Sequence, residues 1–241
     1  IQNYTQGVLQ DWLIQTAHIK PSNKLPTLIN IESRIWFNTE LKSANTIVPG
    51  VIVIVMALVG TLLTSLVIAR EWEHGTMESL MTTPTTIFEI IVGKVIPYFI
   101  LGMFAMFLTV FASIIMFNLP FKGSFIWLII LSSAFMLNSL FLGLLISTIA
   151  KNQFVASIIS LVSAFLPTVM LSGFLFEISS MPYPIRLISH LVPGRYFISG
   201  LRSLFLVGDL PELFVLNTLK MLLLTLIIFF ITTKIIVKRL D

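Results

Sequence analysis

The chain contains 241 residues, of which 56% are hydrophobic and only 11% are charged. An ordinary soluble domain carries about 25% charged residues because most of its surface faces water, so this composition and a mean hydropathy of +0.99 exclude that class of protein. The chain has no cysteine and its three histidines lie far apart in the sequence, which argues against disulfides and metal sites, while its net charge of +4 comes from scattered cations that do not indicate nucleic-acid binding.

The first 47 residues are polar and mixed in charge, and Pro21 and Pro26 interrupt them. They lack the basic start and the apolar run of a signal peptide. We predict that residues 1–47 form the C-terminal part of an extracytoplasmic domain. Because residue 1 is isoleucine rather than methionine, we also expect a missing upstream part of the product, with one further span that carries this domain across the bilayer.

Five later stretches are apolar over the roughly 20 residues that a helix needs to cross a bilayer. Lipid offers the backbone no hydrogen-bond partner, so each crossing is expected to be helical. The predicted spans are residues 48–68, 91–117, 124–149, 154–176 and 212–236. Together they predict an all-α integral membrane protein. Lys94 and Lys220 lie near span ends, where a long side chain can reach the membrane interface.

Lysine and arginine predict the orientation of the spans, because cytoplasmic loops carry an excess of both. If the first span runs from outside to inside, the cytoplasmic side holds Arg70, Lys94, Lys151, Lys234, Lys238 and Arg239. The short outer segments then hold Lys122, Arg186, Arg195 and Arg202. This bias is modest and the opposite orientation stays open, but we predict an extracytoplasmic N-terminal segment and a cytoplasmic C-terminus.

The loop between the first two spans is short and charged, and residues 70–83 predict an amphipathic helix. Helical spacing places Glu71, His74 and Glu78 on one face, opposite apolar residues. One interpretation is a helix that lies on the lipid headgroups. Such helices are usually rich in lysine and arginine, however, and glutamates would repel anionic lipid. The acidity therefore favours docking on a protein partner.

Several motifs carry a resemblance to a known family. The loop reads Arg-Glu-Trp-Glu-His-Gly-Thr-Met-Glu-Ser-Leu from Arg70 to Leu80, and Thr83-Pro84, Gly93-Lys94 and Pro97-Tyr98 follow it. Further matches are Arg34–Asn38, Val48–Gly50, Leu144–Lys151, Leu171–Phe176, Met181-Pro182 and Val192-Pro193. In these motifs the chain resembles the type 2 permeases of ATP-binding-cassette (ABC) exporters, especially those of the bacterial multidrug type. The resemblance implies a six-helix bundle, of which five spans are present, with outer re-entrant helices.

The resemblance also implies that the helix at about residues 70–83 is a coupling helix, which docks in a cleft of an ATPase subunit and transmits its closure. The positions that match the family at this site are Arg70, Glu71, Glu73, Gly75, Thr76 and Glu78. The family more often has arginine where this chain has His74, so one charged contact differs. Gly75 could permit a close backbone approach or could simply weaken the helix, and both interpretations stay open.

No G-x-x-x-x-G-K-[ST] motif occurs in the chain, so it lacks a phosphate-binding loop of the kind that hydrolyses ATP. We therefore predict a transport subunit without cofactor or metal of its own, with ATP and Mg bound by a separate P-loop ATPase subunit. A second permease subunit and the lipid bilayer are further expected partners, and a periplasmic adaptor could join them. The expected location is the bacterial cytoplasmic (inner) membrane.

The function that the resemblance implies is export of hydrophobic or amphiphilic, drug-like compounds by alternating access. Two alternatives stay open: a membrane scaffold or assembly factor without transport, and an exporter of lipid-linked or surface polymers. An intramembrane enzyme would need a nucleophile and a base that converge on one point, and the sequence indicates no such arrangement.

Residues 177–205 are rich in proline but too apolar for a solvated loop. We expect short re-entrant helices here, whose arginines reach headgroups or partner carbonyls. The stretch could form an outer gate, but packing against the bundle is the interpretation that we favour. The polar candidates for a pathway or a dimer contact are Asn138, Ser139, Ser172 and Gly173. For Asn138, hydrogen bonding between helices is the favoured alternative.

Overall fold

The structure is a computed structural model that describes residues 44–81, 84 and 86–238. Most of the predicted extracytoplasmic segment 1–47, including the motif Arg34–Asn38, therefore lies outside the described residues. The regular elements of the described part are all helical, and they belong to one compact unit of the chain. Five of these helices are long and apolar enough to cross a membrane, which confirms the predicted fold class.

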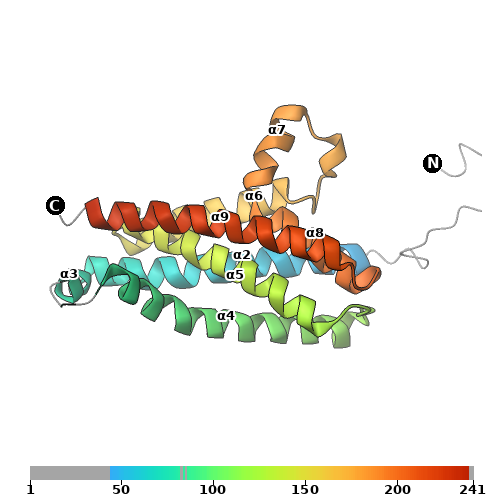
Figure 1. Cartoon of the computed structure of the whole chain (residues 1–241), viewed down its shortest axis with the longest axis horizontal. Helices are drawn as coiled ribbons and strands as arrows, with labels where there is room; N and C mark the ends of the chain where they lie inside the picture. The colour runs from blue at the N-terminus through green and yellow to red at the C-terminus, as the bar shows by residue number, and fades with distance from the viewer. Residues whose placement is uncertain (1–43, 82–83, 85, 239–241) are drawn as a thin grey trace, which may run out of the picture. The chain divides into compact units, whose positions relative to one another are not determined.

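The five long helices lie side by side along one long axis (Figure 1). They are α2 (Ala44–Glu73), α4 (Ile87–Phe117), α5 (Phe125–Ala150), α6 (Gln153–Leu171) and α9 (Pro211–Lys238). α5 is the central helix, because it packs against all the others and 61% of its spanning window is buried, against 22% for α6 and α9. The apolar outer faces of α6 and α9 are thus left for lipid or for another protein.

Side-chain caps fix where three of the helices begin. Thr86 and Glu89 form a reciprocal capping box at the start of α4. The Thr86 N–H donates to Glu89 Oε2 at 2.8 Å, and the Glu89 N–H donates to Thr86 Oγ1 at 3.4 Å. Ser124 caps α5 and Asn152 caps α6, each by accepting hydrogen bonds from N–H groups of the first turn. These bonds satisfy amides that have no partner within their own helix.

α2 and α5 cross closely because small residues lie at their contact. A Cβ on Gly143 of α5 would lie 2.3 Å from the Thr61 carbonyl oxygen of α2. The close approach lets Thr64 Oγ1 donate across the interface to the Leu140 carbonyl oxygen at 3.0 Å. Small residues and interhelical hydrogen bonds replace the hydrophobic effect as the main source of helix association within lipid.

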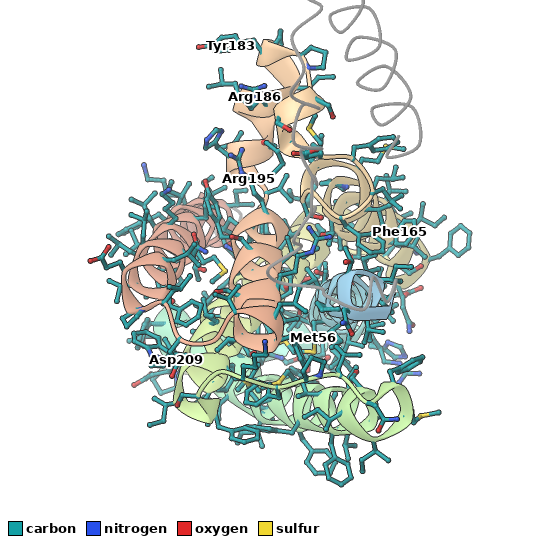
Figure 2. The ribbon with its side chains drawn as sticks, turned by 90° about the vertical axis from the view of Figure 1, so that its right-hand side faces the viewer. Met56, Phe165, Tyr183, Arg186, Arg195 and Asp209 are labelled. Atoms are coloured by element: carbon teal, nitrogen blue, oxygen red, sulfur yellow. The ribbon has the colours of Figure 1, made fainter. Side chains whose placement is uncertain are left out.

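Between α6 and α9 the chain forms a group of short helices and then a longer one. The 3-10 helices η1 (Ile178–Ser180) and η2 (Ser189–Leu191) flank α7 (Tyr183–Ile188), and α8 (Pro193–Leu206) follows. Phe197 of α8 stacks on Phe135 of α5, with 4.4 Å between the ring centroids. α7 has no buried residue and projects from the side of the bundle (Figures 1 and 2). Packing against the bundle, the interpretation favoured for residues 177–205, thus describes α8 but not α7.

The largest differences from the predicted spans lie at the C-terminal ends of α2 and α6. The first span was expected to end at residue 68, but α2 continues to Glu73 because no helix breaker occurs between residue 68 and Gly75. The fourth was expected to end at residue 176, but α6 ends at Leu171. Gly173 adopts a left-handed φ of +87° there and turns the chain, although the residues that follow remain apolar.

Candidate functional site

The segment that links α2 to α4 begins with a tight turn. α2 ends at Glu73, and α3 (Thr76–Met81) follows after a turn in which the Gly75 N–H donates to the Trp72 carbonyl oxygen at 3.2 Å. Gly75 adopts a φ of +71°, a conformation that glycine reaches without a Cβ clash. Residues 70–83 are therefore not the single amphipathic helix that was predicted, because Gly75 divides them. We call residues 70–81 the α2–α3 corner.

The glutamates of the α2–α3 corner make contacts within the chain. Glu71 forms an ion pair with Lys94 of α4, which is the only ion pair in the part of the chain that the structure describes. Glu73 Oε2 accepts a hydrogen bond at 3.2 Å from the backbone N–H of Gln153, the first residue of α6. The corner is thus connected to the beginnings of both α4 and α6.

The structure brings together five of the six residues predicted to contact an ATPase. These are Arg70, Glu71, Glu73, Gly75 and Thr76. Thr76 Oγ1 donates to the Glu71 carbonyl oxygen at 3.1 Å across the turn. The side chains of Thr76 and His74 are exposed. The sixth residue, Glu78, lies on α3, and its side chain is outside the described part of the structure.

Sequence reasoning missed the residues that hold the corner. Lys94 was expected to extend to the membrane interface, but it is partly buried and pairs with Glu71. Lys151, between α5 and α6, places its Nζ 4.9 Å from the centroid of the Trp72 ring, an arrangement that favours a cation over an aromatic face. The sequence did contain a signal for the Lys94–Glu71 pair, since a lysine inside an apolar span requires a counter-ion.

Asn138 and Ser139 lie near the middle of α5, the central helix. Asn138 is buried, and its Nδ2 donates to Thr225 Oγ1 of α9 at 3.2 Å, which is the bond between helices favoured for this residue. The Asn138 Oδ1 is buried without a partner among the described residues. Both residues line a cavity of about 180 Å³ between α2, α5, α6 and α9.

Ser172 and Gly173 lie at a second cavity, of about 550 Å³, between the end of α6 and the helices α8 and α9. The Gly173 carbonyl oxygen accepts a hydrogen bond from Arg202 Nη1 of α8 at 3.2 Å. Burial lowers the pKa of the Arg202 guanidinium from its ordinary value. No residue lines both cavities. The four polar candidates for a pathway or a dimer contact therefore do not form a single site.

The described residues offer no cluster of metal ligands: no three His, Cys, Asp or Glu residues among them lie close enough to hold one ion. Polar groups also meet elsewhere, for example where Arg195 Nη1 donates to Ser189 Oγ. The α2–α3 corner and the linings of the two cavities make contacts suited to docking and to helix packing.

A family model and several curated relatives match most of this chain. The family model described as ABC-2 type transporter matches residues 25–206. The chain is 47% identical over 219 residues to the probable multidrug ABC transporter permease YbhS of Escherichia coli K12, covering 91% of this chain and 58% of that protein.

Two further Escherichia coli K12 proteins are similar at lower identity. The probable multidrug ABC transporter permease YbhR is 27% identical over 204 residues, covering 85% of this chain and 54% of that protein. The inner membrane transport permease YhhJ is 26% identical over 214 residues, covering 86% and 54%. This chain thus spans little more than half the length of these relatives. No solved structure matches it significantly.

Proposed function

This chain belongs to the ABC-2 type transporter family, and from that premise we propose that it is the membrane-spanning subunit of an ATP-driven exporter. Membership of the family and five apolar helices make it a multi-pass membrane protein and a permease subunit of an ABC transporter. The α2–α3 corner is the observation that supports the ATP-driven part of this proposal. It is a short, acidic structure that is bonded to the beginnings of α4 and α6.

The proposed partner at the corner is a separate P-loop ATPase subunit, which binds ATP and Mg. Acidic groups on a compact element suit a cleft that presents arginine and lysine, because complementary charge steers association and fixes the docking register. Arg70, Glu71, Glu73, Gly75, Thr76 and Glu78 remain the proposed coupling positions. Since Glu71 and Glu73 already have partners within the chain, we assign them the positioning of the corner and assign the docking contact itself to Thr76 and Glu78.

The proposed cycle uses two permease subunits and two ATPase subunits. ATP binding closes the ATPase pair and moves the corners, so that the bundles alternate between inward-open and outward-open states. The cargo must bind these states with different affinity, because a ligand with equal affinity for both shifts no equilibrium. We propose hydrophobic or amphiphilic, drug-like cargo, a class that the printed descriptions of YbhS and YbhR as probable multidrug permeases support.

The proposed location is the bacterial cytoplasmic (inner) membrane, with the α2–α3 corner and the C-terminus in the cytoplasm. A periplasmic adaptor on the opposite side would extend the export route. Two cations support this orientation. Lys151 lies beside Trp72 of the corner, and Lys234 belongs to the C-terminal part of α9, the end of that helix that lies nearest α3 in Figure 1.

Charge reversal of Glu78 tests the coupling contact. If Glu78 faces basic groups of the ATPase, Glu78→Lys should reduce co-purification of the ATPase in mild detergent at least about tenfold, because like charges at an interface are strongly disfavoured. The matched control is Glu212→Lys, the same reversal at an exposed position in the first turn of α9, at the other end of the bundle. Glu71 is unsuited to this test because its reversal would also leave Lys94 unpaired.

The measurement is the ratio of ATPase to permease after affinity capture, together with substrate-stimulated ATP hydrolysis in liposomes. The control variant should match the unmodified protein in both. Unchanged capture and unchanged transport by Glu78→Lys would remove α3 from the coupling mechanism. Normal capture of an ATPase that no hydrophobic compound stimulates would instead indicate a scaffold that does not transport.

A further inference from the structure

Arg202 is a partly buried cation that few groups of the described chain satisfy. It lies on α8, and its Nη1 donates to the Gly173 carbonyl oxygen at 3.2 Å. Its Nε is buried and has no hydrogen-bond partner among the described residues. No carboxylate of the described chain forms an ion pair with it, since Glu71 and Lys94 make the only such pair there. A partly buried charge and a buried donor without a partner both lose hydration, so an anionic ligand at this position would satisfy both.

The cavity beside Arg202 has further donors without partners. Ser172 is 1% exposed and Ser203 is 7% exposed, and the hydroxyl of each is buried without a hydrogen-bond partner in the described structure. Both serines and Arg202 line the same cavity of about 550 Å³. Its volume lies within the range of about 300–1,000 Å³ that is usual for small-molecule sites. The cavity thus combines a guanidinium with two buried hydroxyls.

The charge of the lining is positive. Arg195 and Arg202 line the cavity, and Glu177 is its only acidic lining residue. Figure 2 shows Arg195 near the base of the projecting α7 segment, whereas Arg186 lies farther out along α7. Guanidinium groups bind phosphate with two parallel N–H donors and cannot be deprotonated at ordinary pH. The lining therefore favours an anion with several acceptor oxygens, such as a phosphate group.

The rim of the cavity is apolar. Val207 is 41% exposed and Leu210 is 42% exposed, and both line the cavity where α8 turns into α9. A free phosphate would leave these side chains uncovered, whereas an amphiphile would place apolar chains against them. The combination of buried donors with an exposed apolar rim indicates a ligand with an anionic head and an apolar tail.

We propose that this cavity binds the phosphate headgroup of an anionic phospholipid, with Arg202, Ser172 and Ser203 as donors and the acyl chains against Val207 and Leu210. Basic pockets between membrane helices bind anionic headgroups on the cytoplasmic side of membranes, and we extend that chemistry to this cavity at the opposite end of the bundle from the α2–α3 corner. The site is separate from the α2–α3 corner and from the cavity at Asn138. The inference depends neither on the direction of transport nor on its cargo.

Retention of lipid in nanodiscs tests the proposal. The full chain is reconstituted in nanodiscs of phosphatidylglycerol and phosphatidylcholine, and native mass spectrometry measures the phosphatidylglycerol that stays bound. Arg202→Met keeps an unbranched stem of similar length to the apolar part of arginine but removes the guanidinium, and should weaken phosphatidylglycerol binding at least about tenfold, as expected for the loss of a hydrogen bond to a charged group. Lys122→Met is the control, because Lys122 is exposed and does not line the cavity.

A second pair of variants tests headgroup binding at this cavity even if Arg202→Met does not fold. Ser199 lines the cavity but is exposed, so Ser199→Glu should fold and should repel the headgroup, whereas Ser199→Gln adds similar bulk without charge. We expect weakened binding for Ser199→Glu alone. Wild-type retention of the lipid by Ser199→Glu, or by a folded Arg202→Met, would overturn the proposal. Displacement of the lipid by inorganic phosphate at comparable concentration would also overturn it, because it would identify a free-anion site. The assay contains no ATPase, so its result is independent of the proposed function.

Discussion

Asn138 illustrates how a polar side chain is accommodated within the apolar bundle. Its amide nitrogen donates to Thr225 of α9, while its oxygen is buried without a partner among the described residues. Bonds of this kind between membrane helices contribute about 0.5–2 kcal/mol each. The residue type could be recognised from the sequence, because an asparagine in an apolar span needs a partner. The partner could not be identified, since Thr225 is 87 residues away along the chain.

A double-mutant cycle measures the Asn138–Thr225 bond. Asn138→Ala, Thr225→Ala and the double variant should show a coupling of about 0.5–1.5 kcal/mol in the free energy of unfolding, because each single change removes the same hydrogen bond. Denaturant titration of the purified protein in detergent provides the four values. Strictly additive effects would mean that the two side chains do not interact, and Asn138 would return to consideration as a pathway residue.

At the scale of single elements, the crossing of α2 and α5 depends on Gly143. A Cβ at this position would lie 2.1 Å from Thr64 Oγ1 and 2.3 Å from the Thr61 carbonyl oxygen. The second contact is with backbone, so relief would require the helices to move apart. The separation of these helices is therefore set by a residue without a side chain.

Substitution of two glycines separates this packing effect from helix propensity. Gly143→Ala should destabilise the protein by about 1–3 kcal/mol, because the added methyl group overpacks a close interface. Gly93→Ala in α4 adds a methyl group that meets no atom within 4 Å, so it should stabilise by about 0.5–1 kcal/mol through helix propensity. Thermal unfolding midpoints check both expectations. Equal effects of the two substitutions would refute the close crossing.

The ends of elements were predicted less well than their existence. Hydropathy located the spans because the thickness of the bilayer sets their length. It could not locate the end of α6 at Leu171, since apolar residues continue beyond the turn at Gly173. It likewise could not divide residues 70–83, because helical spacing continues across Gly75 while the backbone does not. In both places the decisive feature is a left-handed glycine, which periodicity does not reveal.

At the scale of the whole molecule, the class of protein followed from composition but the arrangement of the helices did not. The sequence predicted five crossings, and the structure has five helices that qualify. The central position of α5 was not predictable from its pattern. A helix that is apolar on all sides presents no polar face to indicate which side is buried. Hydropathy alone therefore cannot distinguish the core helix from those that face lipid.

Cysteine labelling tests the proposed orientation of the bundle. The chain described here contains no cysteine, so Thr76→Cys and Glu212→Cys each introduce one reactive group at an exposed position. A maleimide that does not cross membranes should label Glu212→Cys in intact spheroplasts and Thr76→Cys only after permeabilisation, with the unsubstituted protein as the blank. Labelling of Thr76→Cys in intact spheroplasts would place the corner outside the cell and would contradict the proposal that it docks on a cytoplasmic ATPase subunit.

The two glutamate contacts of the α2–α3 corner have a mechanical consequence. α2 contains 30 residues and is thus about 45 Å long, which exceeds the hydrocarbon core of about 30 Å. Because Glu71 pairs with Lys94 of α4 and Glu73 accepts a hydrogen bond from the start of α6, a displacement of this end, such as the proposed coupling movement, would act on three crossings at once.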